Sequence, residues 1–432
     1  MTSEVFTLPK HSEKSWYKLD NAAKIYPAVQ NAHWQNMYRI SVVMRETVDS
    51  ALLQQAVNDV LPRFPSMKIR MRRGFFWYFF EQNDAMFQVQ EEQGYLMRYI
   101  KKKENNGYLF RVLYFDRRIS IEAFHALTDG FGAFVFVKTM LAQYLRLKGV
   151  SVDCAADIKD INEAATAEEL EDAYSKVPMS ARRFSRKEPV AYQMRGLREI
   201  GNTFHMVSAQ IKLSDIKREA AKHHVTLNVY LTAVMLYAVY CIQQEGRHEK
   251  RRHVRVSVPV NMRRLIPTES LRNFAFYVNV GIDPLLGEYT FEEIVSLTNH
   301  YLNYYMSPKF LYAGISANVA AERNLLVRMM PLFVKKLVLS GVFKMVGERV
   351  VSTTISNLGI ISLPAAMQAH VEAFDVLMGR GLTAKSQCAL ITYGDDLRLT
   401  FTRNIRESKL ERQVLTFLVK QGIGIKVSSN QE

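Results

Sequence analysis

The sequence predicts a mixed α/β fold of the α+β type, and three observations support this prediction. Segments with alternating apolar residues, typical of strands, recur along the chain, as at residues 119–125 and 254–260. Segments with apolar residues three and four positions apart, typical of helices, lie between them, as at residues 134–145. Hydrophobic residues make up 48% of the 432 residues, so the chain can bury sizeable cores.

In the first half, the patterns predict strands, one hairpin and two long helices. Asp49 is expected to cap a helix that runs to Leu61 and ends at the prolines that follow. A hairpin over residues 108–125 leads into a second helix, from Gly130 to about Lys148. Further strands are expected at residues 38–43, 68–72 and 75–80.

The second half follows a connection at residues 151–190, where the composition changes from acidic to basic and proline-containing. Helices are expected to begin at Ser214 and Thr226, and capping boxes are expected at Thr290 and Ser408. One long helical stretch is expected at residues 308–346, and strands at 204–212, 254–260, 273–282, 350–356, 387–393 and 397–403.

The short run at residues 124–130, Phe-His-Ala-Leu-Thr-Asp-Gly, places His125 where a strand pattern gives way to a loop. A neutral imidazole there could accept a proton near pH 7. Asp129 is suited to capping the next helix or to an ion pair, and Gly130 permits a tight backbone. The alternative is an ordinary turn followed by a helix cap, and the spacing alone favours that alternative.

The charge and the cysteines limit the classes of partner. The chain has 57 basic and 42 acidic residues, a net charge of +15, which suits nucleic acid, anionic lipid or a phosphorylated ligand. No nucleic-acid-binding motif is present, so we expect no nucleic acid partner. Cys154, Cys241 and Cys388 lack the spacing of metal ligands, so we expect no metal and a reducing compartment.

The sequence also predicts where the protein resides. The N-terminal residues lack the apolar core of a signal peptide. No uninterrupted apolar run of about 18 residues occurs, so no transmembrane segment is expected. We therefore predict a soluble, cytoplasmic protein.

The spacing His125-x-x-x-Asp129-Gly130 resembles the HxxxDG signature of the chloramphenicol acetyltransferase and condensation-domain superfamily. Residues 123–141 are most similar to its bacterial alcohol acetyltransferase-like members. Two features depart from the superfamily: Phe124 stands where condensation domains commonly have a first histidine, and a DFGWG motif is absent. Other segments resemble the same group in the same order, namely residues 19–24, 258–264, 271–273 and 356–359.

The resemblance implies a fold of two chloramphenicol-acetyltransferase-like lobes. Each lobe would be a mixed β-sheet with flanking helices, and the two would form a V with a tunnel between them. The N-terminal lobe would span residues 1–165 and carry the motif, residues 166–190 would be the crossover, and residues 191–432 would form the C-terminal lobe. We expect a monomer.

The resemblance also implies an activity: transfer of an acyl group, expected to be acetyl, from a CoA thioester to a hydroxyl. His125 would be the general base, and no covalent acyl-enzyme would form. Asp129 and Gly130 would be structural. Arg263 is the expected partner of Asp129, with Arg264 as the alternative.

Three polar residues are candidates for binding the substrate or the oxyanion. Ser356 and Asn357 could donate to the oxyanion, or they could form a polar turn after a strand. Asn279 is a weaker candidate. Acyl-CoA is the expected co-substrate, and candidate basic clusters for its phosphates lie at residues 101–103, 182–187 and 251–253.

The acceptor is expected to be a small-molecule or lipid alcohol. Residues 329–345 are apolar and basic, and they could lie on a membrane surface, although a buried domain helix with two exposed lysines is favoured and Pro331 interrupts the helix. Two alternatives stay open: acyl transfer or condensation from an acyl-carrier protein thioester in lipid or natural-product assembly, and a catalytically silent binding module. The sequence does not determine the acyl chain length.

Overall fold

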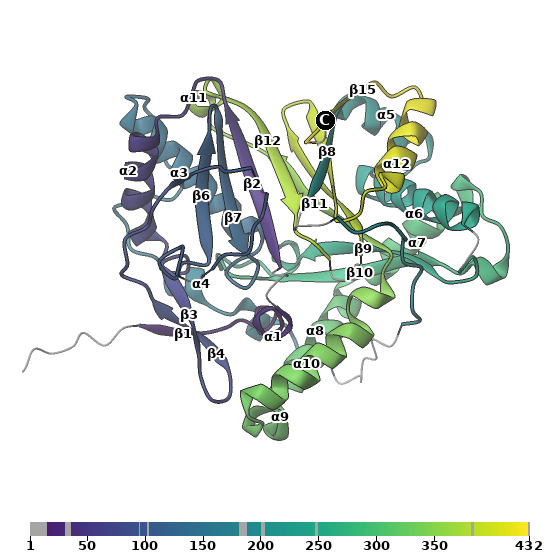
Figure 1. Ribbon diagram of the computed structural model, residues 1–432, viewed down its shortest axis with the longest axis horizontal. Coiled ribbons are helices and arrows are strands. Elements are labelled where there is room, and N and C mark those ends of the chain that lie inside the picture. The colour runs from purple at the N-terminus through teal and green to yellow at the C-terminus, as the bar shows by residue number, and fades with distance from the viewer. Residues whose placement is uncertain are drawn as a thin grey trace, which may run out of the picture.

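The protein is built on two main β-sheets that stand side by side, each with helices on its outer flank (Figure 1). The computed structural model describes residues 15–30, 36–94, 96–101, 103–180, 188–199, 204–246, 249–381 and 384–430. The predicted α/β class and the flanking helices are confirmed.

The first sheet has five strands in the order β12-β2-β7-β6-β5. Helix α2 begins after Asp49, whose carboxylate accepts hydrogen bonds from the next turn as expected. Helix α3 is almost wholly buried and follows directly from the His125 motif. The elements are α2 (Ser50–Val60), α3 (Gly130–Leu147), β2 (Met37–Met44), β5 (Gln90–Glu91), β6 (Phe110–Phe115), β7 (Arg118–Phe124) and β12 (Val371–Met378).

The second sheet has seven strands in the order β10-β9-β11-β13-β14-β8-β15. Its strands are β8 (His205–Lys212), β9 (Val254–Asn261), β10 (Ala275–Ile282), β11 (Thr353–Ile361), β13 (Ser386–Tyr393), β14 (Asp396–Arg403) and β15 (Ile425–Ser429). Its helices are α5 (Leu213–Lys222), α6 (Leu227–Glu245), α7 (Phe291–Tyr305) and α12 (Lys409–Lys420).

A third, smaller unit lies below the two sheets in Figure 1. It combines a three-stranded sheet, in the order β1-β4-β3, with helices from both halves of the chain. Its elements are β1 (Trp16–Lys18), β3 (Ile69–Arg73), β4 (Tyr78–Gln82), α1 (Ile25–Val29), α8 (Pro308–Arg323), α9 (Leu325–Met329) and α10 (Leu332–Val346).

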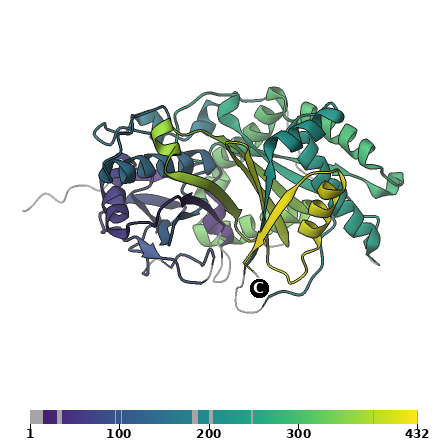
Figure 2. The ribbon, with the colours of Figure 1, turned by 90° about the horizontal axis from the view of Figure 1, so that it is seen from above.

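One segment crosses from the second half of the chain into the first sheet. Strand β12 pairs antiparallel with β2, and in Figure 1 this yellow-green strand lies beside the purple one. The short helix α11 (Ala365–Gln368) lies among the N-terminal helices (Figure 2). Phe374 and Val376 of β12 pack in the core of the first lobe. A division of the chain at residue 191 therefore does not account for β12, which follows that residue in the sequence but belongs to the first sheet.

The crossover between the lobes is packed where the structure describes it. Helix α4 (Ala167–Leu170) carries Glu169, which forms a buried ion pair with Arg63 at 2.6 Å. The Tyr174 hydroxyl donates to the carbonyl oxygen of Ala275 at 2.6 Å. These contacts fix residues 166–180 against both lobes, and residues 181–187 lie outside the described residues.

Three of the predicted elements are corrected by the structure. The long stretch at 308–346 is three helices, because the chain leaves the helical conformation at Asn324 and again before Pro331. Strand β4 begins at Tyr78 because the residues before it form the turn from β3. Ser408 makes no side-chain cap, because its backbone (φ −89°, ψ 39°) is not in the extended conformation of a capping residue; the Glu411 carboxylate, the other half of the expected capping box, forms a buried ion pair with Arg403.

Two findings concern membranes and metals within the described part of the chain. No single helix there is long and apolar enough to cross a membrane, although α5 and α6 together, bent by 80°, reach the required length and composition. No group of three or more His, Cys, Asp or Glu side chains there is arranged to hold a metal ion.

Candidate active site

His125 lies just after β7, and its ring is held from two sides. Its backbone N–H donates to the carbonyl oxygen of Asn36 at 2.8 Å. The ring centroid lies 5.2 Å from that of Tyr26 in α1 and 5.1 Å from that of Tyr38 in β2. The Tyr38 hydroxyl in turn donates to the carbonyl oxygen of Thr128 at 3.1 Å. The imidazole is thus half-buried and fixed in orientation.

A series of hydrogen bonds between side chains determines the tautomer of this imidazole. His125 Nδ1 lies 3.1 Å from Oδ1 of Asn273. The amide nitrogen of Asn273 donates to Oδ2 of Asp20 at 3.2 Å, so its carbonyl oxygen must face the histidine. An oxygen at that position requires a proton on Nδ1. The Nε2 atom of the neutral ring is therefore the one that can accept a proton.

Asp20 is fully buried at the far end of this series of hydrogen bonds. Burial raises the pKa of its carboxyl group, and the nearby Arg272, 3.7 Å away, and the backbone N–H of Ala23 act in the opposite direction. The carboxylate has few conformations open to it, because Ala23 and Asn273 each donate to a different oxygen. It is therefore suited to holding the Asn273 amide in one orientation.

Asp129 is occupied entirely by structural contacts. Its Oδ1 accepts from the backbone N–H of Gly132 at 3.2 Å, which caps α3. Its Oδ2 accepts from Nη1 of Arg263 at 2.7 Å and from the backbone N–H of Phe274 at 2.8 Å. The contact expected with Arg263 is present, and Arg264 is exposed. Asp129 also caps α3, which is the role that the alternative interpretation of the motif gave it.

Arg263 ties the loop before β10 to the histidine motif. Its Nη2 donates to the carbonyl oxygens of Ser270 at 2.7 Å and Arg272 at 2.5 Å, and its guanidinium lies 4.5 Å from the ring centroid of Phe131. The ion pair with Asp129 is buried. Residues 270–274 are thus held against the start of α3, which places Asn273 beside His125.

Two glycines in α3 allow the lobes to approach closely. A Cβ at Gly130 would meet Leu358 Cδ2 at 2.5 Å. A Cβ at Gly132 would lie 2.1 Å from the carbonyl oxygen of Leu271 and 2.3 Å from Oγ1 of Thr128. Gly130 was expected to be structural, whereas Gly132 was not singled out, because only the tertiary contact shows its importance.

The run Ser356–Gly359 lies inside β11 rather than in a turn after it: Ser356 and Asn357 pair regularly with β13, and a β-bulge follows between Asn357 and Ile360. Asn357 Oδ1 accepts from the backbone N–H of Gly359 at 2.9 Å, and Gly359 has φ +87°. The bulge projects Leu358 onto Gly130, so this run lies close to the histidine motif. Roles for Ser356 and Asn357 toward an oxyanion stay predictions.

Asn279 lies in β10, and its side chain contacts Glu188 and not His125. Its amide nitrogen donates to Glu188 at 2.7 Å, while its buried Oδ1 has no hydrogen-bond partner among the residues that the structure describes. Burial raises the pKa of the Tyr26 phenol, and Tyr277, two residues before Asn279 on the same strand face, is close enough to add to that rise. The contacts given for Asn279 do not reach His125.

The predicted phosphate-binding clusters are only partly described. Residues 182–187 and Lys102 lie outside the described residues. Lys101 pairs with Glu104 at 2.8 Å, and Arg252 lies 3.3 Å from Glu249, so part of this charge is already compensated within the protein. A phosphate site at these clusters stays a prediction. The structure outlines no tunnel beside His125 within the described residues, so the tunnel also stays a prediction.

The fold and the sequence both resemble known acyltransferases. Residues 172–375 match the family model described as alcohol acetyltransferase. The match confirms the predicted class of enzyme, an acyltransferase. Within that class, it confirms the resemblance to the alcohol acetyltransferase family that the His125 motif first indicated. No curated protein matches the chain significantly in sequence.

Three solved structures share the fold across nearly the whole chain. TRI101 of F. sporotrichioides, complexed with coenzyme A and T-2, has a TM-score of 0.62 at 10% identity, covering 96% of this chain and 99% of that one. The TRI3 trichothecene 15-O-acetyltransferase from Fusarium sporotrichioides has a TM-score of 0.59 at 11% identity, with 94% of each chain covered. The starter condensation domain of rhizomide synthetase, in complex with C8-CoA, has a TM-score of 0.58 at 13% identity, again with 94% of each chain covered. The predicted superfamily fold is confirmed.

Proposed function

We propose that this protein transfers an acetyl group from a CoA thioester to an acceptor hydroxyl, with His125 as the general base. The observation that carries the proposal is the chain from Asp20 through Asn273 to His125 Nδ1. This chain dictates which ring nitrogen is protonated, and it leaves Nε2 to accept the proton of an acceptor.

In the proposed reaction, Nε2 of His125 takes the proton of the acceptor hydroxyl as its oxygen attacks the thioester carbonyl carbon. The resulting tetrahedral oxyanion collapses, and the bond between carbon and sulfur breaks. The imidazolium returns its proton to the leaving thiolate, so the products are an ester and free CoA thiol. A positioned base of this kind contributes about 10²–10⁴-fold to the rate, and the remainder comes from holding two substrates together.

The remaining polar groups have supporting roles in this proposal. The hydroxyl of Ser356, two residues before Leu358, which lies against Gly130, is the proposed donor to the oxyanion. Asn357 shapes the bulge in β11 through its bond to Gly359. Asp129 and Arg263 act through the loop that carries Asn273 and do not contact the substrates.

The choice of donor and acceptor is supported by the comparisons and the charge. TRI101 is complexed with coenzyme A, and the rhizomide synthetase domain with C8-CoA. The name of TRI3 states O-acetyl transfer, which requires a hydroxyl acceptor. A net charge of +15 favours a donor that carries several phosphates. The resemblance to a condensation domain favours, as the second candidate, a carrier-protein thioester.

The test is thiol release from a panel of acyl-CoAs, acetyl to palmitoyl, with alcohol and amine acceptors. Wild type is compared with His125→Ala and with His300→Ala, a control at an exposed histidine in α7. We expect acceptor-dependent release that falls at least about 100-fold in His125→Ala and is unchanged in His300→Ala. Equal release by wild type and His125→Ala would refute the proposed base. Release only from a pantetheinylated carrier protein would replace the proposed donor.

A further inference from the structure

One end of the molecule carries a concentrated apolar surface, formed by the turn between β3 and β4 together with α9 and α10 (Figure 1). We call this surface the apolar knob. Monomeric proteins rarely expose large contiguous apolar patches unless those patches bind something. The knob is defined by six large apolar side chains, each 61–78% exposed: Phe75, Leu325, Leu326, Met329, Phe333 and Leu337.

The knob is a built structure in which segments distant in the sequence are joined. The backbone N–H of Leu332 donates to the carbonyl oxygen of Phe75 at 2.8 Å. Lys335 is almost fully buried, and its Nζ donates to the carbonyl oxygen of Phe76 at 3.0 Å, across 259 residues of sequence. The same Nζ donates to the carbonyl oxygen of Arg328 at 3.1 Å and lies 3.8 Å from the ring centroid of Trp77. Desolvation lowers the pKa of this amine.

These contacts prepare the turn for an apolar environment. The N–H of Gly74 donates to the carbonyl oxygen of Trp77 at 2.9 Å and closes the turn. The carbonyl oxygens of Phe75 and Phe76 are taken up by α10. Four backbone groups of the turn, the N–H of Gly74 and the carbonyl oxygens of Phe75, Phe76 and Trp77, therefore have partners inside the protein, and these hydrogen bonds need not be lost when the tip leaves water.

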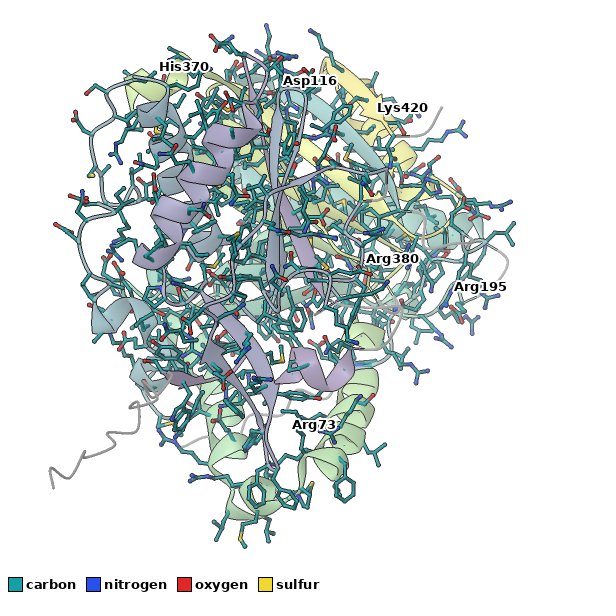
Figure 3. All side chains as sticks on the ribbon, turned by 60° about the vertical axis from the view of Figure 1, so that its left-hand side comes forward. Arg73, Asp116, Arg195, His370, Arg380 and Lys420 are labelled. Carbon is teal, nitrogen blue, oxygen red and sulfur yellow. The ribbon has the colours of Figure 1, made fainter. Side chains whose placement is uncertain are left out.

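The charged residues of α9 and α10 are all basic, and Glu322, which precedes these helices, is paired with Lys24. Residues 323–347 contain five Lys and Arg residues and no Asp or Glu. Of these, Arg323, Arg328 and Lys336 are exposed. Arg73, at the neighbouring turn, is also exposed and is labelled at this end of the molecule in Figure 3. The favoured interpretation of residues 329–345 as a buried helix with two exposed lysines is wrong, because Lys335 is buried while Phe333 and Leu337 face solvent.

We propose that the apolar knob docks the protein on the surface of a membrane that contains anionic phospholipids. The six apolar side chains would enter the interfacial region, and the exposed basic side chains, Arg328 and Lys336 among them, would lie at the lipid phosphates. Apolar side chains flanked only by basic ones are the combination that interfacial binding requires. A protein partner or a second copy of the chain would not need this single sign of charge.

The position of the knob relates docking to the candidate active site. Helix α10 packs against α1, and α1 supplies Tyr26, whose ring lies against His125. Docking would therefore hold this side of the protein near the membrane, where a lipid alcohol is available as an acceptor. The docking itself does not depend on the proposed acyl transfer and can be tested in a protein without activity.

The experiment is flotation of the purified protein with vesicles of phosphatidylcholine alone or mixed with phosphatidylglycerol. The test variant is Leu325→Ser with Leu326→Ser. Its matched control is Leu285→Ser with Leu286→Ser, a second pair of adjacent exposed leucines that lies outside the knob. We expect wild type to float with the mixed vesicles, to float less with pure phosphatidylcholine, and to be released by high salt.

The substitutions separate the apolar and electrostatic contributions to binding. We expect the knob double variant to lose about 10–100-fold in vesicle affinity, and the control pair to bind like wild type. Lys336→Glu should weaken binding to mixed vesicles only, while Lys426→Glu, an exposed lysine in β15, should not. Circular dichroism confirms that each variant is folded.

Three results would overturn the proposal. Wild type that floats with neither vesicle would do so, as would a knob double variant that binds like wild type. The third is a change in molecular mass, measured by light scattering, in which wild type is a dimer and the knob double variant a monomer without vesicle binding by either. That result would assign the surface to a second copy of the chain.

Discussion

The substitution Asn273→Ala removes the group that connects His125 to the buried carboxylate of Asp20. In the variant, Nδ1 of His125 loses its acceptor, and Asp20 loses one of its donors. The ring keeps its aromatic neighbours Tyr26 and Tyr38, so it stays near its position while the tautomer is no longer dictated. Asn273 is thus a positioning residue, and its loss should cost less than loss of the base itself.

The expected magnitude follows from these contacts. Leaving a buried charged group without one donor costs about 1–3 kcal/mol, and the lost hydrogen bond to the histidine adds about 1 kcal/mol to the destabilisation. Partners that orient a metal-ligating histidine typically contribute about 10–100-fold to activity, and we expect the same range for a partner that orients a histidine base. We therefore expect kcat/KM for acyl transfer to fall by about 10–100-fold, with KM for acyl-CoA little changed.

The assay is thiol release by wild type, Asn273→Ala, His125→Ala and the double variant. Because Asn273 acts through His125, adding its substitution to His125→Ala should leave the residual rate unchanged. Asn83→Ala, at a fully buried asparagine whose amide donates to the carbonyl oxygen of Asn106 and not to a residue of the site, is the control for loss of a buried amide. A further tenfold loss in the double variant, or an equal loss in Asn83→Ala, would refute the reasoning.

Four other substitutions test the supporting structure. Arg263→Met should lower the free energy of unfolding in urea by about 3–5 kcal/mol, since it leaves Asp129 in a buried ion pair without its partner, and a loss below about 1 kcal/mol would contradict the clamp. Gly132→Ala should lower the free energy of unfolding by at least about 2 kcal/mol, because the added Cβ meets a backbone carbonyl. Gly130→Ala should lower it by less, because there the added Cβ meets a leucine side chain that can move. Equal losses in the two variants would be inconsistent with these contacts. Burial and the charge of a nearby carboxylate raise the pKa of Asp172 to about 6, above its value in the unfolded chain, so its contribution to stability is lost as the pH rises from about 4 to 6. Asp172→Asn should therefore unfold at a higher temperature than wild type at pH 7 but not at pH 4, and a difference that is equal at both values would contradict this.

The sequence predicted those parts of the fold that depend on local patterns. The Asp49 cap, the hairpin before His125 and the capping box at Thr290 are all present, because each depends on residues close together in the chain. The capping box expected at Ser408 is absent, because the backbone at Ser408 is not extended and the Glu411 carboxylate pairs with Arg403, a contact that the local sequence does not indicate.

Elements that depend on distant contacts were not predicted. Strand β12 has an ordinary strand pattern, and nothing local indicates that it joins the first sheet instead of the second. The exposed face of α10 was misjudged, because an apolar helix pattern does not show whether another element covers it. The hydrogen bond from Lys335 to the turn after β3 determines which face of α10 is buried, and that contact spans 259 residues.

The candidate site shows the same division. His125, Asp129 and Arg263 were identified through the resemblance, and the structure brings the last two together. Asp20 and Asn273 lie in segments that resemble the same superfamily, but no role was assigned to them. Their contact spans 253 residues, and that of Asn273 with His125 spans 148, so neither follows from local sequence.

The most direct test of the central claim is the tautomer of His125 in the unliganded protein. Nitrogen-15 NMR of histidine-labelled protein distinguishes a protonated from an unprotonated ring nitrogen, and the spectrum of His125→Asn assigns the signals. At neutral pH we predict a proton on Nδ1 and none on Nε2 in wild type, with this preference weakened in Asn273→Ala. A proton on Nε2 and none on Nδ1 in wild type would contradict the account, because the proposed base would then point its lone pair at Asn273 and away from any acceptor.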